Sequence, residues 1–182
     1  IGEILHYYLY ADSPLFDEMI DHYEMIIQNR NLFAKHIRES LKIKRDVIEQ
    51  DEFDRAERNK FNYGHTFGHA IESITNYSIK HGQAVTIGMD MANYVSMKLG
   101  LMSREMFQRI HSRLSVNFPE YDWTKIDVDA YFNLLAKDKK NVGTNIGCIL
   151  AESPGRLHKL QLPLDGRLRE IIHSYISGIS VS

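Results

Sequence analysis

The chain has 182 residues, of which 43% are hydrophobic and 25% charged, a composition typical of a globular domain with a real core. Its formal net charge of -2 at pH 7 offers no field for nucleic acid or membrane surfaces, and no apolar run approaches the roughly 18 residues of a membrane span. The single cysteine, Cys148, excludes an intramolecular disulfide and favours a reducing compartment, which we take to be the cytoplasm.

The first third of the sequence has the periodicity of helices. The chain begins at Ile1, directly in an apolar helical pattern and without a leader, so we expect a piece cut from a longer protein. Apolar residues at i, i+3 and i+4 spacing predict a helix around residues 4–9. A second helix begins near Pro14 and carries an apolar stripe as far as Ile27. The third covers residues 32–50, with one face formed by Phe33, Ile37, Leu41, Lys44 and Ile48.

The middle of the chain alternates charged turns with further helices. Residues 51–60 are highly charged and predict a turn, after which residues 65–77 read as a buried helix. A long helix opens at His81 and ends with Gly100 as the residue after its C-cap. Ser103 is the expected N-cap of a helix over 103–116.

The last part contains a strand pair between helices. A short helix is expected over residues 127–136, followed by a basic turn. Residues 146–162, with Ser153-Pro154-Gly155 at their centre, predict a β-hairpin, and helix resumes after Gly166. The sequence therefore predicts a mainly α fold, a single multi-helix domain over residues 1–182 with one small β-hairpin.

Three histidines lie within 17 residues of one another, in a segment rich in glycine. His65 and His69 stand four residues apart on a predicted helix and share a face, and His81 follows twelve residues later. Neutral imidazole is the commonest metal ligand, and glycines such as Gly64 and Gly68 permit close backbone approach. This cluster predicts a metal or catalytic site. Spacing alone favours His65 with His69 as ligands and does not exclude His65 with His81.

Cationic and amide side chains near this cluster are candidates for anion binding. Arg58 and Asn62 are four residues apart, and arginine binds carboxylates through two hydrogen bonds. Lys44 is read from spacing alone as a lysine whose stem covers apolar surface. For Arg58, solvated surface charge and anion binding are equally good readings of the sequence. Lys139 can neutralise a phosphate, although a basic turn is more often solvated. The sequence has no glycine-rich phosphate loop and no G-x-S-x-G element.

The histidine segment resembles the C-terminal domain of the 3-dehydroquinate synthase family, the sugar-phosphate cyclases. The resemblance is carried by Arg58-x-x-x-Asn62-x-Gly64-His65-Thr66-Phe67-Gly68-His69-Ala70-Ile71-Glu72 and by His81-Gly82-x-Ala84-Val85-x-Ile87-Gly88-Met89. It extends to Gly2-Glu3-Ile4-Leu5, to 40–44, to 51–52, to 99–101 and to 138–140, and so covers most of residues 1–150. The family has an N-terminal NAD-binding domain, which this resemblance implies is absent from the chain.

The resemblance implies a set of site residues. Glu3, His65 and His81 would bind the metal, Zn2+ or Co2+, which moves His69 into contact with the substrate. Lys44 and His69 match catalytic positions. Substrate would be held by Arg58, Asn62, Lys139 and His6.

The reaction implied is that of an NAD- and metal-dependent phosphorus–oxygen lyase of the shikimate pathway, which supplies aromatic amino acid biosynthesis. Such an enzyme converts 3-deoxy-D-arabino-heptulosonate 7-phosphate to 3-dehydroquinate. NAD+ transiently oxidises a ring hydroxyl, phosphate leaves, the ketone is reduced again, and the opened ring closes by aldol addition, so there is no net redox change. A phosphorylated sugar acid is thus the expected partner, with neither nucleic acid nor membrane. Relatives are commonly homodimers, the isolated chain should be inactive, and a bacterial source is expected.

Two positions depart from the family pattern and keep other readings open. His6 stands where the family usually has lysine, and Gln83 where it usually has glutamate. A cyclase for another sugar phosphate, such as sedoheptulose 7-phosphate, is therefore an alternative. A non-catalytic relative and a stand-alone histidine-based metal hydrolase are the other two.

Overall fold

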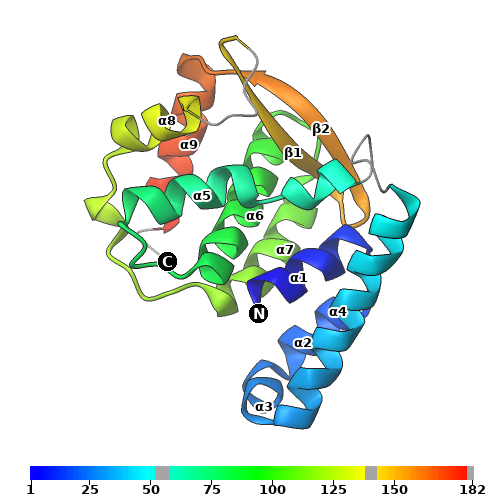
Figure 1. Cartoon of the computed structure of the whole chain (residues 1–182). Helices are drawn as coiled ribbons and strands as arrows, with labels where there is room; N and C mark the ends of the chain where they lie inside the picture. Colours follow the sequence, from blue (N-terminus) through cyan, green and yellow to red (C-terminus); the bar gives the residue numbers. More distant parts are fainter. Residues whose placement is uncertain (52–57, 138–142, 180–182) are drawn as a thin grey trace.

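The computed structural model describes residues 1–51, 58–137 and 143–179, with the Arg58 side chain left out. At its centre lies helix α6 (His81–Lys98), which packs against α1 (Gly2–Tyr10), α5 (His65–Ile74), α7 (Arg104–Leu114) and α9 (Gly166–Ile179) (Figure 1). Most of α6 is buried, because a helix that is apolar on nearly all sides must be covered by neighbours.

Glycines let three helices cross at backbone contact. A Cβ on Gly2 of α1 would lie 1.8 Å from the carbonyl oxygen of Gly82 in α6. A Cβ on Gly88 of α6 would lie 2.0 Å from the carbonyl oxygen of Gly64, at the start of α5. Real Cβ atoms do not come this close to backbone atoms, so only glycine permits these crossings. The start of α1 is therefore held against the first turn of α6, and the start of α5 against the middle of α6.

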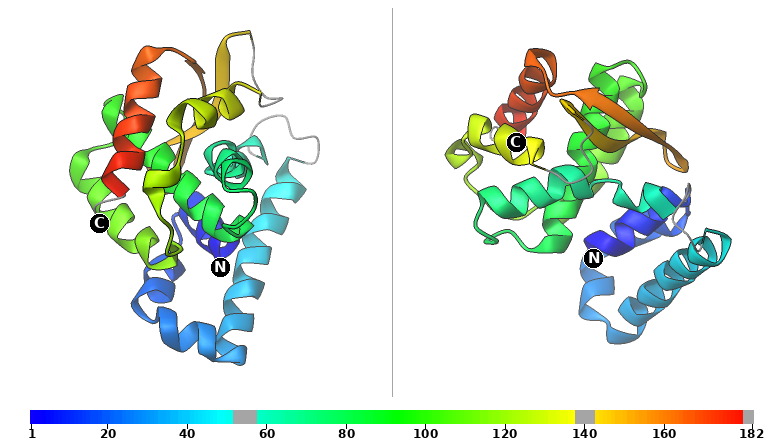
Figure 2. Two further views of the ribbon diagram at one scale, coloured as in Figure 1. Left: turned by 90° about the vertical axis from the view of Figure 1, so that its left-hand side faces the viewer. Right: turned by 45° about the horizontal axis from the view of Figure 1, so that its top comes forward.

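The segment between α1 and α5 projects from the rest of the helices. The projecting part is formed by α2 (Leu15–Asp21), α3 (Tyr23–Gln28) and α4 (Arg30–Gln50), and α4 runs beside α1 (Figure 1 and Figure 2). One continuous second helix was expected here, but His22, at φ -121° and ψ 26°, ends α2 and separates it from α3. Asn29 caps α4, because its side-chain oxygen accepts hydrogen bonds from the backbone N–H groups of Asn31 and Leu32.

The predicted inner face of α4 is wrong. Ile37 and Leu41 are exposed, at 38% and 52%, whereas His36, Ser40 and Val47 are buried. The reason is a polar contact that hydrophobic periodicity does not register: the Tyr8 hydroxyl of α1 lies 2.9 Å from Nδ1 of the buried His36. This hydrogen bond joins the buried face of α4 to α1.

The rest of the chain closes the core on the other side of α6. The 3-10 turns η1 (Arg58–Asn62), η2 (Ser115–Asn117) and η3 (Trp123–Lys125) and the short helix α8 (Val128–Ala136) join the larger elements. Strands β1 (Asn145–Ser153) and β2 (Arg156–Pro163) form an antiparallel pair in which Cys148 faces Leu160. Strand β1 is buried along most of its length against α5, α6 and α8.

The predicted fold class is confirmed: the described residues form a mainly helical unit with one two-stranded sheet. Ser103 caps α7, and Gly100, at φ +79°, follows the C-cap of α6, as expected. Of the turn predicted over residues 51–60, residues 52–57 lie outside the described part of the chain and residues 58–60 belong to η1. Residues 138–142 of the predicted basic turn also lie outside it. Among the described helices, none combines the length and the apolar character that a lipid bilayer demands.

Candidate metal centre

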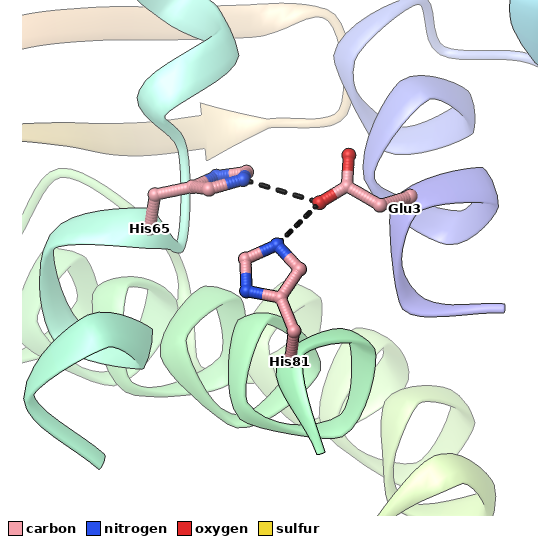
Figure 3. A group of neighbouring side chains, drawn as sticks. All are labelled: Glu3, His65 and His81. Carbon is pink, nitrogen blue, oxygen red and sulfur yellow. Dashed lines mark hydrogen bonds and ion pairs between the residues drawn. The ribbon is translucent and has the colours of Figure 1, made fainter. Parts of the chain in front are cut away.

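Three side chains from distant parts of the sequence converge where α1, α5 and α6 begin (Figure 3). Oε1 of Glu3 lies 3.2 Å from Nε2 of His65 and 3.1 Å from Nε2 of His81. Each of the three residues directly follows or precedes a glycine of the crossings described above, since Gly2, Gly64 and Gly82 are their neighbours. The close helix crossings are therefore what places these side chains within reach of one another.

Both imidazoles turn the same nitrogen toward Glu3. Nδ1 of His65 lies 3.1 Å from the carbonyl oxygen of Tyr63, which can only accept, so this nitrogen carries the proton. Nδ1 of His81 lies 3.1 Å from Oε2 of Glu72. With Nδ1 protonated, a neutral ring presents an Nε2 lone pair. Two such lone pairs facing one carboxylate oxygen are stable only if each ring gains a second proton or if all three groups share a cation.

The donor set fits a divalent metal such as zinc. Three ligand atoms, one from each residue, lie within 4.8 Å of one another. Zinc–nitrogen and zinc–oxygen bonds of about 2.1 Å place tetrahedral ligands about 3.4 Å apart, close to the distances of 3.1 and 3.2 Å measured here. Two imidazoles and one carboxylate are a known catalytic zinc set, and three protein ligands leave a fourth position for substrate oxygen.

The electrostatics of the site favour bound positive charge. The hydrogen bond from His65 lowers the pKa of Glu3 to about 2, against the opposing effect of burial, so this carboxylate is ionised at neutral pH. Partial burial acts to lower the pKa of His81, but Glu72 and Glu3 outweigh it and the pKa is raised. Protons on the imidazoles and a metal ion both supply positive charge beside the Glu3 carboxylate, so protons and metal compete for the site.

His69 lies at the edge of this cluster, on the solvent side. Its ring stacks on that of His81 at 5.9 Å between centroids and meets that of His65 edge-on at 5.5 Å. A second group of possible ligand atoms combines His69, Glu72 and His81. The pair favoured by spacing, His65 with His69, is therefore adjacent in space, while the carboxylate of Glu3 groups with His65 and His81.

His6 lies behind the metal ligands and is fully buried. Its ring is 5.2 Å from that of His65. Neither ring nitrogen has a partner at hydrogen-bond geometry among the described residues, although the Phe61 backbone lies near enough to favour the charged form. Burial, together with the neighbouring His65, lowers the pKa of His6 to about 3. A neutral imidazole therefore occupies this position.

The other predicted substrate-binding residues have contacts away from the three candidate ligands, or lie outside the part of the chain that the structure describes. The Lys44 ammonium lies 5.9 Å from the centroid of the Tyr7 ring, a cation–π contact between α4 and α1. Asn62 donates to the carbonyl oxygen of Asn59. The Arg58 side chain and Lys139 fall outside the described residues.

Sequence reasoning assigned no role to Glu72, although the structure places it against a candidate ligand. The sequence did contain a signal for this residue, because Glu72 lies two helical turns after His65 and therefore on the same face of the predicted helix. Glu3 was beyond spacing arguments because 61 residues separate it from His65, and only the resemblance pointed to it.

Fold and donor set together define a helical domain with a candidate metal centre at the meeting point of three helix starts. Residues 1–141 match the family model described as 3-dehydroquinate synthase C-terminal. The chain belongs to this family.

Named relatives agree with this assignment. The chain is 42% identical over 131 residues to the 3-dehydroquinate synthase of Campylobacter concisus, an alignment that covers 71% of this chain and 37% of the relative. It is 30% identical over 181 residues to that of Thermodesulfovibrio yellowstonii, with 95% and 49% covered. The chain thus spans about half or less of the length of these relatives.

Solved structures share the architecture. A 2-deoxy-scyllo-inosose synthase complexed with carbaglucose-6-phosphate, NAD+ and Co2+ superposes with a TM-score of 0.68 at 27% identity, covering 80% of this chain and 42% of that one. A 2-epi-5-epi-valiolone synthase from Streptomyces hygroscopicus with NAD+ and Zn2+ bound gives 0.80 at 18% identity, covering 98% and 50%, and is evidence for the fold alone.

Proposed function

We propose that the chain is the metal- and substrate-binding part of a 3-dehydroquinate synthase-like cyclase, acting in the cytoplasm as a homodimer. Its substrate would be 3-deoxy-D-arabino-heptulosonate 7-phosphate, from which phosphate is released to give 3-dehydroquinate. NAD+ would be bound by a further domain outside this chain, without which the chain alone has no activity. The observation that carries the proposal is the convergence of Glu3, His65 and His81 at the spacing of a three-ligand metal site.

The proposed roles follow from charge and position. A bound Zn2+ or Co2+ lowers the pKa of coordinated hydroxyl groups and polarises a carbonyl. His69, exposed beside the ligands, is placed to exchange a proton with a substrate oxygen. Lys44, Arg58, Asn62 and Lys139 would bind the two anionic groups of the substrate, and His6 would border it from the buried side.

A different sugar phosphate is the second candidate, favoured by one observation. The buried, neutral His6 occupies a position where the family usually has a cation. A substrate without a carboxylate, such as sedoheptulose 7-phosphate, would need less positive charge in the pocket. Assays of the full-length protein with NAD+ separate the two: turnover of the heptulosonate supports the first candidate, and turnover of sedoheptulose 7-phosphate alone overturns it.

Metal titration tests the site itself. We expect the chain to bind one Zn2+ or Co2+ per molecule in calorimetry. His65→Ala should weaken the affinity by more than about 100-fold, because removing a ligand costs more affinity than removing a residue that only hydrogen-bonds to a ligand. His173→Ala, which removes an exposed histidine of α9, is the matched control and should bind as the unaltered chain does. Absence of binding, or equal affinity of both variants, would remove the assignment of the metal centre.

A further inference from the structure

Glu72 makes a directed contact with the back of the His81 ring. Its Oε2 lies 3.1 Å from Nδ1, the nitrogen opposite to the one that faces Glu3. Glu72 belongs to α5 and His81 is the first residue of α6, so the contact spans the turn between the two helices. One imidazole is thereby held between two carboxylates, one at each nitrogen.

The burial of the two partners distinguishes this contact from a surface ion pair. The side chain of Glu72 is only 12% exposed, whereas that of His81 is 48% exposed. Exposed pairs contribute little because both side chains must be ordered from solution. Here the carboxylate is largely buried and the imidazole is half exposed, so the contact joins a shielded acceptor to a ring that solvent would otherwise leave free to turn.

We propose that Glu72 is a positioning residue of the metal centre: it holds His81 as the Nδ1–H tautomer, with the Nε2 lone pair aimed at the position shared with Glu3 and His65. This inference rests on the proposed function, because it assumes that a cation occupies that position. Metal-bound histidines generally donate their second ring N–H to a carboxylate or carbonyl, which orients the ring and increases its basicity. His65 has its equivalent partner in the Tyr63 carbonyl oxygen.

The competing reading is that Glu72 is itself a ligand, in the second group with His69 and His81. In that group a metal would bind Nδ1 of His81 and a carboxylate oxygen of Glu72, so the two would share an ion in place of a hydrogen bond. The two readings differ in the number of ions bound and in the proton on Nδ1.

Two substitutions of Glu72 separate these readings by Co2+ titration, followed through the visible absorption of the bound ion. Glu72→Ala removes the acceptor and should weaken Co2+ binding by about 10- to 100-fold, the range known for such outer contacts. Glu72→Gln keeps an acceptor oxygen and should restore much of the affinity. Glu120→Gln removes the same charge at an exposed loop position and should leave binding unchanged. All four proteins should bind one ion.

Proton NMR of the zinc-loaded chain reports the tautomer directly. We expect a low-field imidazole N–H signal that disappears in His81→Ala, moves in Glu72→Gln and is lost by exchange with water in Glu72→Ala. Equal affinity of Glu72→Ala and Glu120→Gln would overturn the positioning role while leaving the metal site intact. Two ions per chain, or a Glu72→Gln variant as weak as His65→Ala, would overturn it in favour of direct ligation. If the unaltered chain binds no metal, the proposed function itself fails.

Discussion

Replacing Gly88 by alanine should destabilise the chain by at least about 3 kcal/mol, the upper end of the cost of overpacking. The added Cβ would lie 2.0 Å from the carbonyl oxygen of Gly64 and 2.6 Å from the backbone nitrogen of Gly68. Both neighbours are backbone atoms of the start of α5, so no side chain can move aside to relieve the contact. Helices α5 and α6 must separate instead.

The same substitution should weaken metal binding, because α5 carries His65 and α6 carries His81. A separation of about 1 Å between the helices is enough to spoil a site that depends on ligand geometry. Denaturant unfolding and Co2+ titration measure the two effects. Gly178→Ala is the matched control: this glycine is an exposed helical residue of α9 with no atom near its Cβ position, so alanine should be neutral or slightly stabilising. Equal stability of the two variants would contradict the role assigned to the crossing.

Local patterns in the sequence predicted the elements well, because helix starts and stops are signalled by nearby residues. Ser103, Gly100 and the Ser153-Pro154-Gly155 turn act within a few residues of their own position. The buried face of α4 was not predictable in this way, since it includes His36, whose hydrogen-bond partner Tyr8 lies 28 residues away in the sequence. A polar residue that is buried because of one distant partner has no periodic signature.

The residues of the candidate site also differ in how far local sequence could identify them. Clustering in sequence identified the three histidines, and a single helix turn explains why His65 and His69 are adjacent. His81 and Glu3 come close to His65 only because α1, α5 and α6 cross at backbone contact. These crossings are possible because glycine has no Cβ atom. Glycines such as Gly2 and Gly88 read as weak helix residues in sequence. In three dimensions they set the distances between the ligands.

A second large effect is expected at Asp90, a fully buried carboxylate of α6. Its Oδ2 accepts hydrogen bonds from Nδ1 of His111 in α7 at 2.8 Å and from the Tyr175 hydroxyl in α9 at 2.7 Å. Asp90→Ala leaves a buried hydroxyl and an imidazole without their acceptor, which should cost about 3–5 kcal/mol of unfolding free energy. Asp46→Ala, at an exposed position of α4, should leave stability unchanged in the same denaturant experiment.

This contact also gives stability a pH dependence with a definite sign. The hydrogen bond to Asp90 raises the pKa of His111 above its usual value of 6.5, against the opposing effect of burial. The folded state therefore holds this proton more tightly than the unfolded chain. The stabilisation is complete below pH 6.5 and is lost as the pH rises through the higher folded-state pKa, so the free energy of unfolding should fall across that interval.

His111→Gln isolates this contribution, because glutamine can still donate to Asp90 but does not titrate. His81, whose pKa is also raised, titrates in the same interval in both proteins, so the difference between their unfolding free energies reports His111 alone. That difference should favour the unaltered chain most strongly near pH 6 and should shrink toward pH 9. A difference that stays constant with pH would mean that the His111 pKa is the same in the folded and unfolded chains. Asp90 would then accept a hydrogen bond from His111 without stabilising its protonated form.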